Sequence, residues 1–374
     1  MRRDTPVHPN PRAIRSLSAT ASDGPSILSA NLRPRTCRSR RSGAAAAGRL
    51  RMTRDFTHLP VMRDEVVALI ENCPHGVILD ATVGGAGHAG AILSASARHR
   101  LIGIDRDPEA VRVARERLSA FGARARVVLA RFDELGSVLD EEAPSEPLVA
   151  ALFDLGVSSP QIDVSERGFS YRSDAPLDMR MGPDAELSAA VIVNEWPEEA
   201  LAALFAEHGE ARHSRRIARA VVAARPLATT TELAELVQRA VPAGGPRRRG
   251  HPATRVFQAL RVTVNEELTQ LPIALEAATR RLAPGGRSVV ISYHSGEDRL
   301  VKQVFNEAAA GWCRCPVGLP CVCGAQPAVR LLNRGAQLAT KAEVSENPRA
   351  SSARLRAVER LDARWRRPES EEDE

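Results

Sequence analysis

The chain has 374 residues, of which 43% are hydrophobic and 26% are charged, so it can bury the core of one large domain or two. No run approaches the roughly 18 consecutive apolar residues that a membrane-spanning helix requires, which argues against a membrane protein and predicts a soluble, cytoplasmic one. The formal net charge of +6 is unevenly placed: residues 1–54 contribute +10, and the tail from Glu369 holds five acidic groups and no base. The remainder is nearly neutral, so a nucleic-acid partner has to be argued from local patches.

Residues 1–54 combine arginine, serine, alanine and proline with few large apolar side chains. Such a composition cannot offset the entropy lost on ordering, so we predict a disordered, Arg-rich extension. It has no continuous apolar stretch of the kind found in secretory signals, but a transit peptide fits its composition. The alternatives are an extended start, since Met52 stands just before the first patterned segment, or a dispensable tail. Residues 366–374 are predicted to be an acidic tail.

From Gly76 onward, short apolar runs alternate with segments of helical periodicity. The runs are GVILDATV, RLIGIDRD, ARVVLARF and LVAALFDLGV, which start at residues 76, 100, 125 and 148. Between the second and third lies PEAVRVARERLSAFG, in which Pro108 suits a first helical turn and Gly122 suits a helix end. Buried strands separated by helices predict a parallel sheet covered on both faces, with the ligand site at the carboxyl ends of the strands.

A fifth apolar run, GGRSVVISYHS, follows the helical segment LPIALEAATRRLAPGG but begins about 130 residues after the fourth run. Connections in such sheets are usually short, so the intervening stretch must carry structure of its own. Its amphipathic segments PEEALAALFAEHG, RHSRRIARAVVAA and TTELAELVQRAV are typical of helices. We therefore predict an α/β, Rossmann-like fold with an all-helical domain over residues 162–268, inserted between the fourth and fifth strands.

The stretch DATVGGAGHAG at residues 80–90 contains the spacing Gly85-x-Gly87-x-x-Gly90 of a dinucleotide-binding turn. Glycines in such a turn let the backbone come close to a ligand, because no Cβ intervenes. Asp105 follows the second strand twenty residues beyond Gly85, where its carboxylate can accept both hydroxyls of an adenosine ribose. These features suit NAD and S-adenosylmethionine equally.

Two further features separate these ligands. Asp80 ends the first strand ahead of the glycines, where a fixed negative charge disfavours a pyrophosphate but suits the sulfonium or the amino group of S-adenosylmethionine. The segment DLGVSSPQ closes the fourth strand with a carboxylate, two hydroxyls and a Pro-fixed turn, where a planar amine could be held. The alternatives are an NAD-dependent oxidoreductase, from the glycine spacing alone, and a non-enzymatic nucleic-acid-binding module on a degenerate Rossmann core. Both leave the acidic strand ends and DLGVSSPQ unexplained.

Seven segments together carry a family resemblance: HLPVMRDEV, DATVGGAGH, GIDRDPEA, DLGVSSPQIDVSERGFSYRSDAPLDMRM, HPATRVFQALRVTVNEEL, LAPGGRSVVISYHSGEDRLVK and ENPRASSARLRAVER. From about His58 to about Leu361 the chain resembles the bacterial MraW/RsmH-type methyltransferases, which N4-methylate a cytosine of 16S ribosomal RNA. The resemblance implies a class I S-adenosylmethionine-dependent methyltransferase fold, with residues 55–161 and 269–365 as the methyltransferase domain. It also implies a target in the decoding region and a partner that is either small-subunit ribosomal RNA or the assembled small subunit, with no membrane. The oligomeric state stays open.

By motif matching, the resemblance implies cofactor contacts at Ala86, Gly87, His88, Asp105, Phe132, Asp154 and Gln161. Taken alone, Phe132 is more typical of a core residue and Gln161 of a turn. The sequence departs from the family pattern at Ala86, where glycine is usual and the extra methyl group lies at the cofactor edge. It departs again in YHSGEDR, where Tyr293 and Gly296 stand in place of Phe and Leu.

Methyl transfer to a cytosine amine is an in-line displacement whose main demand is alignment of nitrogen, methyl and sulfur. The lone pair of the amine is delocalised into the ring, so a group that accepts its N–H bonds helps to localise it. We hypothesise that Asp154, or the Ser158/Ser159 turn behind it, plays this part. His294, at the end of the fifth strand, could face the same cleft or be a satisfied structural histidine.

Residues 212–261 carry eleven arginines against Glu232 and Glu235. A basic strip beside a neutral remainder is typical of phosphate contacts, although such a run can also be a solvated helix face. The target base must leave its stack to react, and RNA is typically read at loops or irregular helices for this reason. We therefore predict that the inserted domain contacts the RNA, with binding that weakens steeply with salt.

Four of the six cysteines gather in CRCPVGLPCVC, as Cys313, Cys315, Cys321 and Cys323. Two close pairs separated by a Pro/Gly turn could hold a structural zinc tetrahedrally, although C-x-C pairs are less characteristic than C-x-x-C pairs. Disulfides do not suit a reducing cytosol. The sequence leaves a structural zinc site and plain surface thiols as open alternatives.

Overall fold

The computed structural model describes residues 59–157, 161, 165–241, 251–316 and 321–363. The predicted N-terminal extension, the acidic tail, Ser158, Ser159 and the arginines at 247–249 lie outside these residues. Within the described part of the chain, no helix is both long enough and apolar enough to cross a membrane.

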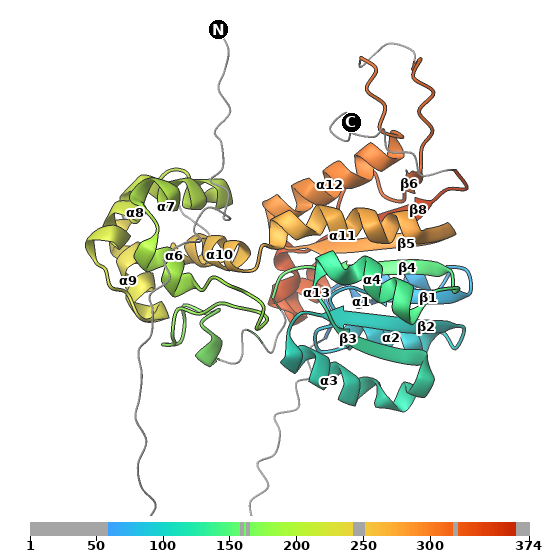
Figure 1. The fold of residues 1–374 in the computed structure, drawn as a ribbon, viewed down its shortest axis with the longest axis horizontal. Helices are drawn as coiled ribbons and strands as arrows, with labels where there is room; N and C mark the ends of the chain where they lie inside the picture. Colours follow the sequence, from blue (N-terminus) through green and yellow to red (C-terminus); the bar gives the residue numbers. More distant parts are fainter. Residues whose placement is uncertain (1–58, 158–160, 162–164, 242–250, 317–320, 364–374) are drawn as a thin grey trace, which may run out of the picture. The chain divides into compact units, whose positions relative to one another are not determined.

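Across the described residues, eight strands form one sheet in the order β3-β2-β1-β4-β5-β8-β6, with β7 paired to β8 (Figure 1). Neighbours among β1 to β5 are parallel, whereas β8 runs antiparallel to β5, β6 and β7. The strand order reverses between β1 and β4, and ligands of open α/β sheets bind at the carboxyl ends beside such a reversal. The strands are β1 Gly76–Asp80, β2 His99–Asp105, β3 Ala125–Leu129, β4 Leu148–Asp154, β5 Leu282–Ser292, β6 Val329–Leu331, β7 Gln337–Leu338 and β8 Arg354–Arg360.

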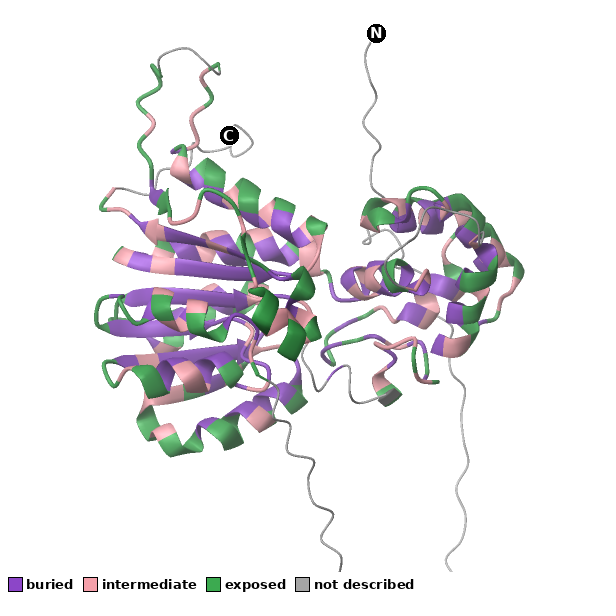
Figure 2. Ribbon diagram, turned by 180° about the vertical axis from the view of Figure 1, so that it is seen from behind, coloured by how far each residue is buried: buried purple, intermediate pink, exposed green. Residues whose placement is uncertain are grey.

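Helices cover both faces of the sheet, which confirms the predicted fold class. Apolar side chains of α1, α2 and α3 form one buried cluster with one face of the strands, and those of α4, α11 and α12 form a second cluster with the other face. Figure 2 shows the central strands β1, β2 and β4 buried along most of their length, while the helices expose their outer surfaces. Burial on both faces explains why the strands appear in the sequence as continuous apolar runs. The helices are α1 Arg63–Ile70, α2 Gly87–Ala95, α3 Pro108–Leu118, α4 Leu135–Glu142, α11 Glu267–Arg281, α12 Ser295–Ala309 and α13 Lys341–Glu346.

Local sequence signals determine where the elements begin and end. At the start of α3, the side chain of Asp107 accepts a hydrogen bond from the backbone N–H of Glu109, and Pro108 occupies the first turn. Beyond the helix, Gly122 adopts a φ of 55°. The first four apolar runs each continue two or three residues past the end of their strand. Those extra residues form the loops at the carboxyl ends of the strands, where the ligand site was predicted.

Between β4 and β5, the described residues form helices and one isolated β-bridge. Their apolar side chains make a third buried cluster, which contains no residue of the sheet. The predicted segments appear as α7, α8 and α9, whereas α10 was not predicted as a helix. The helices of this segment are α6 Ala189–Glu195, α7 Glu198–Phe205, α8 Ser214–Ala223, α9 Thr230–Ala240 and α10 Ala253–Val264.

Asn265 connects the two stretches of chain that link this helical segment to the sheet. Its side-chain carbonyl accepts the N–H of Met181 at 2.9 Å, and its side-chain amide donates to the carbonyl of Met179 at 2.8 Å. Arg106, in the loop after β2, donates to the backbone carbonyl of Asn265 at 2.6 Å and pairs with Asp184 at 2.8 Å. Both stretches of chain are thereby held against the loop after β2, beside the carboxyl ends of the strands.

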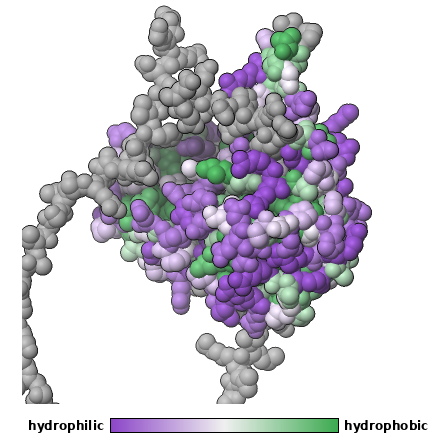
Figure 3. Space-filling model, turned by 45° about the vertical axis from the view of Figure 1, so that its right-hand side comes forward, coloured by the Kyte–Doolittle hydropathy of each residue, from purple (hydrophilic) through white to green (hydrophobic). Residues whose placement is uncertain are grey.

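The surface is largely polar on the face shown in Figure 3, where hydrophobic residues occur in small groups between hydrophilic ones. Large apolar side chains that are exposed include Leu59, Leu129, Ile273, Val322, Leu331 and Leu338. Scattered exposure of this kind is normal for a folded chain and indicates no function by itself.

Candidate active site at the carboxyl ends of the strands

Acidic residues end three neighbouring strands: Asp80 ends β1, Asp105 ends β2 and Asp154 ends β4. These strands are adjacent and parallel, so the three residues share one edge of the sheet, as the sequence predicted. Thr82 links two of them. Its hydroxyl accepts the backbone N–H of Asp154 at 2.7 Å, and its own N–H donates to Asp80 Oδ1 at 3.2 Å. Asp80 and Asp154 therefore lie at the point where the strand order reverses.

Asp154 is held by side chains from two other elements. The hydroxyl of Tyr293, just after β5, donates to Asp154 Oδ1 at 2.7 Å, and His88 Nδ1, in the first turn of α2, lies 3.5 Å from Oδ2. Burial raises the pKa of Asp154, while His88 and the Tyr293 hydrogen bond oppose that rise. Burial and the charge of Asp154 also raise the pKa of Tyr293, so its hydroxyl remains a donor. The sequence marks Tyr293 only as a departure from a family pattern, so motif matching missed this contact.

His88 is buried and makes contacts through both ring nitrogens. Its Nε2 lies 2.9 Å from the backbone carbonyl of Val61, and because a carbonyl only accepts, we assign the proton to Nε2. Its Nδ1 then faces the carboxylate of Asp154, and two acceptors at this distance repel each other unless one of them carries a proton. The Asp154–His88 pair is thus a place where a proton taken from a substrate can be accepted and shared.

Asp80 is buried, and its burial raises its pKa to about 7, with His88 opposing the shift and the charge of Asp154 adding to it. At neutral pH the charge of Asp80 is therefore not fixed, because burial disfavours the ionised form and part of the population keeps its proton. A cation bound beside Asp80 would favour the ionised form. The preference for a cationic ligand over a pyrophosphate is unchanged.

The loop between β1 and α2 has an unusual conformation at Ala86. This residue precedes the first turn of α2 with φ 60° and ψ 26°, a left-handed conformation that costs a residue with a Cβ about 1 kcal/mol or more. At Gly87 a Cβ would lie 2.7 Å from Pro60 Cγ, so the missing side chain makes room for the chain's own proline. Its predicted contact with a cofactor stays a prediction.

Asp105 and Asp107 organise the end of β2. Asp105 accepts the N–H groups of Gly84 and Asp107, each at 2.9 Å, and its burial raises its pKa to about 6. Each of its oxygens keeps a second lone pair for a ligand hydroxyl. Asp107 Oδ2 accepts from Gln161 Nε2 at 3.0 Å and pairs with Arg167. Gln161 is therefore buried and positioned, and Asp107 and Arg167 are site-shaping residues that the sequence argument missed.

Phe132 begins a short 3₁₀ turn after β3, Phe132–Glu134. Its ring contacts that of Phe153 edge-on, with centroids 5.8 Å apart, and it packs against the second buried cluster while half-exposed. The structure thus gives it a packing role, and its predicted contact with a cofactor stays a prediction.

His294 caps the start of α12. Its Nδ1 accepts the N–H of Glu297 at 3.3 Å, and its own backbone N–H donates to Glu297 Oε2 at 3.2 Å. Its Nε2 lies 3.1 Å from Glu297 Oε1. Burial of Glu297 by itself would raise its pKa, yet His294 and Arg261 reverse this and lower it. His294 therefore has a structural role at Nδ1, and its catalytic role remains a prediction.

The predicted basic strip divides into two kinds of arginine. Three are engaged in the fold: Arg225 donates to backbone carbonyls of α6 and its end, Arg255 donates to the carbonyl of Gly209 at 2.7 Å, and Arg261 binds both oxygens of Glu267 at 2.8 Å. The arginines that the structure describes on and just before α8 are exposed, and they are Arg212, Arg215, Arg216 and Arg219. Of these, Arg219 Nε lies 3.5 Å from Glu198 Oε1. Arg239, on α9, is exposed and pairs with Glu235.

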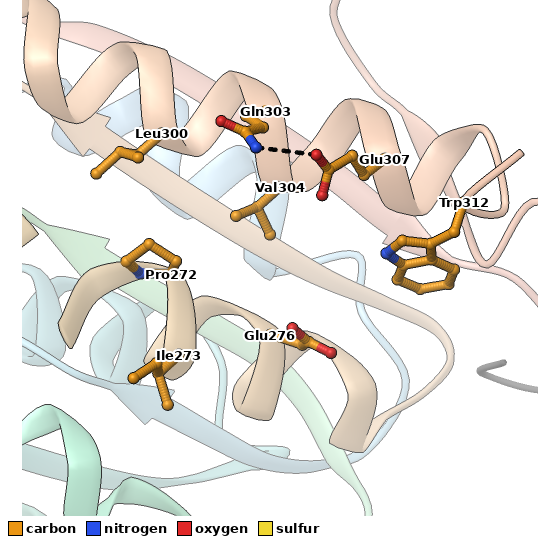
Figure 4. A pocket seen from close by; sticks show the side chains of 8 residues that line it. All are labelled: Pro272, Ile273, Glu276, Leu300, Gln303, Val304, Glu307 and Trp312. Atoms are coloured by element: carbon orange, nitrogen blue, oxygen red, sulfur yellow. Dashed lines mark hydrogen bonds between the residues drawn. The ribbon is translucent and has the colours of Figure 1, made fainter. Parts of the chain in front are cut away.

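Two further features lie away from the strand ends. The four cysteines come together in the loop that follows α12. A groove of about 260 Å³ lies between α11 and α12 (Figure 4), lined by Pro272, Ile273, Glu276, Leu300, Gln303, Val304, Glu307 and Trp312. This lining shares no residue with the acidic strand ends, so we do not assign the groove to their chemistry.

Comparisons with known proteins identify the family. The sequence model of the MraW methylase family matches residues 55–361. Relatives named ribosomal RNA small subunit methyltransferase H include one from Geobacter sulfurreducens, 50% identical over 82% of this chain and 99% of its own length, and one from Heliobacterium modesticaldum, 46% identical over 82% and 99%. A solved rRNA methylase from Streptococcus thermophilus aligns over 80% of this chain and 93% of its own, with 14% identity and a TM-score of 0.34. The resemblance predicted from the motifs is confirmed, and the chain belongs to the MraW methylase family.

Proposed function

We propose that this chain transfers a methyl group from S-adenosylmethionine to the N4 amine of one cytosine in 16S ribosomal RNA. Membership of the MraW methylase family and the names of the relatives support this reaction. The observation that carries it in the structure is the convergence of Asp80, Asp154, His88 and Tyr293 where the strand order reverses. A carboxylate, a histidine and a hydroxyl at this position suit an amine that must lose a proton.

The chemistry of the donor set fits S-adenosylmethionine, which supplies an electrophilic methyl group on a sulfonium. Asp80 is a buried carboxylate and Asp105 a partly buried one, and desolvation raises both pKa values, so a bound cation would stabilise their ionised forms. Asp105 retains lone pairs for ribose hydroxyls, and Asp80 suits a positively charged group. By motif matching, the residues that would hold the cofactor are Ala86, Gly87, His88, Asp105, Phe132, Asp154 and Gln161.

Asp154 is the residue that we assign to the amine. Its Oδ1 is engaged by Tyr293, so Oδ2 is the oxygen that remains for an N–H of the substrate. Accepting that N–H would draw the lone pair of the amine out of the ring. As the methyl group leaves the sulfur for the nitrogen, the proton of the amine would pass to Asp154, beside His88. His294 and Ser159 remain candidates for a further contact with the base.

The two alternative functions gain no support. A pyrophosphate of NAD at the start of α2 would lie beside Asp154 and Asp80, and each of them disfavours it to the extent that it is ionised. A binding module without activity would have no use for a partly buried carboxylate that is oriented by a tyrosine and lies beside a histidine. Family membership also favours methyl transfer over both alternatives.

We further propose that the helical segment between β4 and β5 contacts the RNA through its exposed arginines. Arg212, Arg215, Arg216 and Arg219 lie on and just before α8, on a segment with its own buried core. Exposed arginines on a rigid helix suit phosphate groups, because the guanidinium fork binds two oxygens at once. The substrate would be met in the cytoplasm, as free RNA or in the small subunit.

The reaction is tested by incubating the purified chain with labelled S-adenosylmethionine and either free 16S RNA or small subunits that lack the modification. We expect N4-methylcytidine at a single nucleotide, located by nuclease digestion and mass spectrometry, and loss of transfer in Asp154→Asn. Label on a ring carbon, on several unrelated nucleotides, or none despite cofactor binding would contradict the proposal. Comparing the two substrates decides between free RNA and the assembled subunit.

A further inference from the structure

The four cysteines after α12 form a compact cluster of sulfur atoms. Cys313 Sγ lies 3.5 Å from Cys321 Sγ and 3.6 Å from Cys323 Sγ, and the last two sulfurs are 3.5 Å apart. With Cys315 included, all four sulfurs lie within 4.8 Å of one another. Both C-x-C pairs thus face the same point in space.

These distances suit a single metal ion and not disulfide bonds. A disulfide requires about 2.05 Å between sulfurs, whereas the closest pairs here are 3.5 Å apart. Four thiolates at about 2.3 Å from one zinc ion, in a tetrahedron, lie about 3.8 Å from each other. The observed spacing matches this edge length, and a multi-iron cluster would hold its thiolates farther apart.

The fold offers no other reason for the cysteines to converge. The described residues 313–316 and 321–327 form no helix or strand, and the loop stands out from the surface beside the end of α12 (Figures 1 and 3). Val322, between two of the cysteines, is 89% exposed, so apolar burial does not order the loop. Ordering such a segment costs conformational entropy that must be offset by some bond. A metal ion bound by the four cysteines supplies four such bonds.

Arg314 stands between the first two cysteines of the cluster in the sequence. It adds a positive charge to a segment whose four thiolates would otherwise carry excess negative charge.

The position of the cluster indicates a structural role. Helix α12 starts at the active-site edge and runs for 15 residues, which is about 22 Å at 1.5 Å per residue, so the cysteines lie far from the strand ends. The two ends of the loop are held together by the Ala328 N–H, which donates to the carbonyl of Ala308 at 2.9 Å. Strand β6 begins at the next residue and is the last strand of the sheet on this side.

We propose that Cys313, Cys315, Cys321 and Cys323 bind one zinc ion tetrahedrally, closing the loop between α12 and β6. The ion fixes the loop and thereby holds β6 in register at the edge of the sheet. It takes no part in methyl transfer, so the proposal stands independently of the proposed function.

The test begins with the full chain purified without added metal and analysed by elemental mass spectrometry. We expect one zinc per chain. The double variant Cys313→Ser/Cys321→Ser, which removes one ligand from each pair, should lose it. Cys73→Ala is the matched control, because Cys73 is buried beside α1, away from the cluster, and it should retain one zinc per chain. Hydrogen exchange in residues 311–316 and 321–331 should increase about tenfold or more when zinc is removed by a chelator, while exchange in β1 and β4 stays unchanged.

Cobalt replacement keeps the test decisive if the double variant does not fold. The wild-type chain, stripped of zinc and loaded with Co²⁺, should show the intense visible absorption of tetrahedral cobalt with thiolate ligands, reversed by adding zinc. Stoichiometric iron, two disulfides in the chain as purified under reducing conditions, or zinc retained by the double variant would overturn the proposal. So would a wild-type chain that holds neither zinc nor cobalt.

Discussion

Tyr293 donates a hydrogen bond of 2.7 Å to Asp154 Oδ1 and so connects the residue after β5 to the end of β4. Because Oδ1 is engaged in this way, Oδ2 faces His88 and is the oxygen left for a substrate. Gly156 lies against the ring, since a Cβ added there would be 3.4 Å from Tyr293 Cδ2. The orientation of the proposed catalytic carboxylate thus depends on a side chain that departs from the usual family pattern.

Replacing Tyr293 by Phe should shift the pH dependence of turnover. The hydrogen bond from Tyr293 lowers the pKa of Asp154, so its loss leaves more of the carboxyl protonated at a given pH. If turnover requires the ionised form, the acidic limb of the kcat profile moves to higher pH by about one unit, which corresponds to about 1.4 kcal/mol. Wild-type turnover should return at high pH. A rate that falls equally at every pH would indicate a structural effect only.

Replacing Asp154 by Asn separates catalysis from cofactor binding. We expect kcat to fall by about 100-fold, because an amide cannot take the proton of the amine. The dissociation constant for S-adenosylmethionine, measured by calorimetry, should rise by much less, about threefold, because Asp154 is one of several residues assigned to the cofactor and asparagine keeps the shape of its side chain. Asp133→Asn, at an exposed carboxylate paired with Arg131, is the control. Full turnover with weakened cofactor binding would contradict the assignment of Asp154 as a catalytic residue.

Cofactor binding should strengthen as the pH rises through neutrality. The pKa of Asp80 is about 7 in the folded chain, above the ordinary value near 4, so its proton must leave before a cation is bound tightly. Affinity for S-adenosylmethionine should rise about tenfold from pH 6 to pH 8 and then level off, with proton release detectable in buffers of different ionisation enthalpy. Asp80→Asn should bind more weakly with no such slope. A flat wild-type profile would contradict the role of Asp80.

The raised pKa of Asp80 also affects the stability of the folded chain. A carboxyl group whose pKa is raised on folding binds a proton that the unfolded chain releases. The contribution of Asp80 to the free energy of unfolding is therefore largest below about pH 4 and is lost as the pH rises to about 7. Saturating cofactor should offset that loss, because the ligand binds only the folded chain.

Ala86→Gly should stabilise the chain. Ala86 has φ 60°, and relieving this left-handed conformation should raise the free energy of unfolding by about 1 kcal/mol, or the Tm by about 2 °C. Ala89→Gly removes the same methyl group from a regular helical position in α2 and should destabilise by a similar amount. Thermal unfolding of both variants checks the opposite signs. Destabilisation by both would show that the Ala86 methyl group is needed for packing.

Neutralising two arginines of α8 should weaken RNA binding without affecting the cofactor site. Arg215 and Arg216 are exposed, so Arg215→Gln/Arg216→Gln removes up to two phosphate contacts and should reduce the slope of log affinity against log salt by about 1.5 to 2. The dissociation constant for S-adenosylmethionine should stay the same. Arg112→Gln, at an exposed arginine on α3 paired with Glu109, should leave the slope unchanged. An unchanged slope in the double variant would indicate that the arginines of α8 form a solvated helix face that does not contact the RNA.

The fold could be predicted where burial dominates the sequence. Strands β1, β2 and β4 are buried almost throughout and β5 is buried over its second half, and these strands appear as apolar runs. The cap formed by Asp107 and Pro108 marks the start of α3. Strand β8 was missed because its sequence, RLRAVER, carries charges that are compensated only by tertiary contacts. Arg356 pairs with Asp298 at 2.7 Å, and Glu359 pairs with Arg330 at 2.7 Å. Both partners lie outside the strand's own sequence, so the local pattern could not indicate a strand.

The site could be predicted in part. Acidic strand ends follow from the strand pattern, and the parallel order brings them together. The contacts that orient them were not predictable, since Tyr293 reaches Asp154 from 139 residues away and Arg167 reaches Asp107 from 60 residues away. The sequence also gave no sign that Gly87 makes room for Pro60.

The place of β8 in the sheet affects how the chain folds during synthesis. Among the described strands β8 is the last in sequence, yet it lies between β5 and β6, and β6 joins the sheet only through it. Until Arg354–Arg360 has left the ribosome, Val289, Val290 and Ile291 of β5 therefore present an open, apolar strand edge to other chains. A chain truncated shortly before this segment would keep every residue assigned to methyl transfer, but it would be prone to aggregation and a target for degradation.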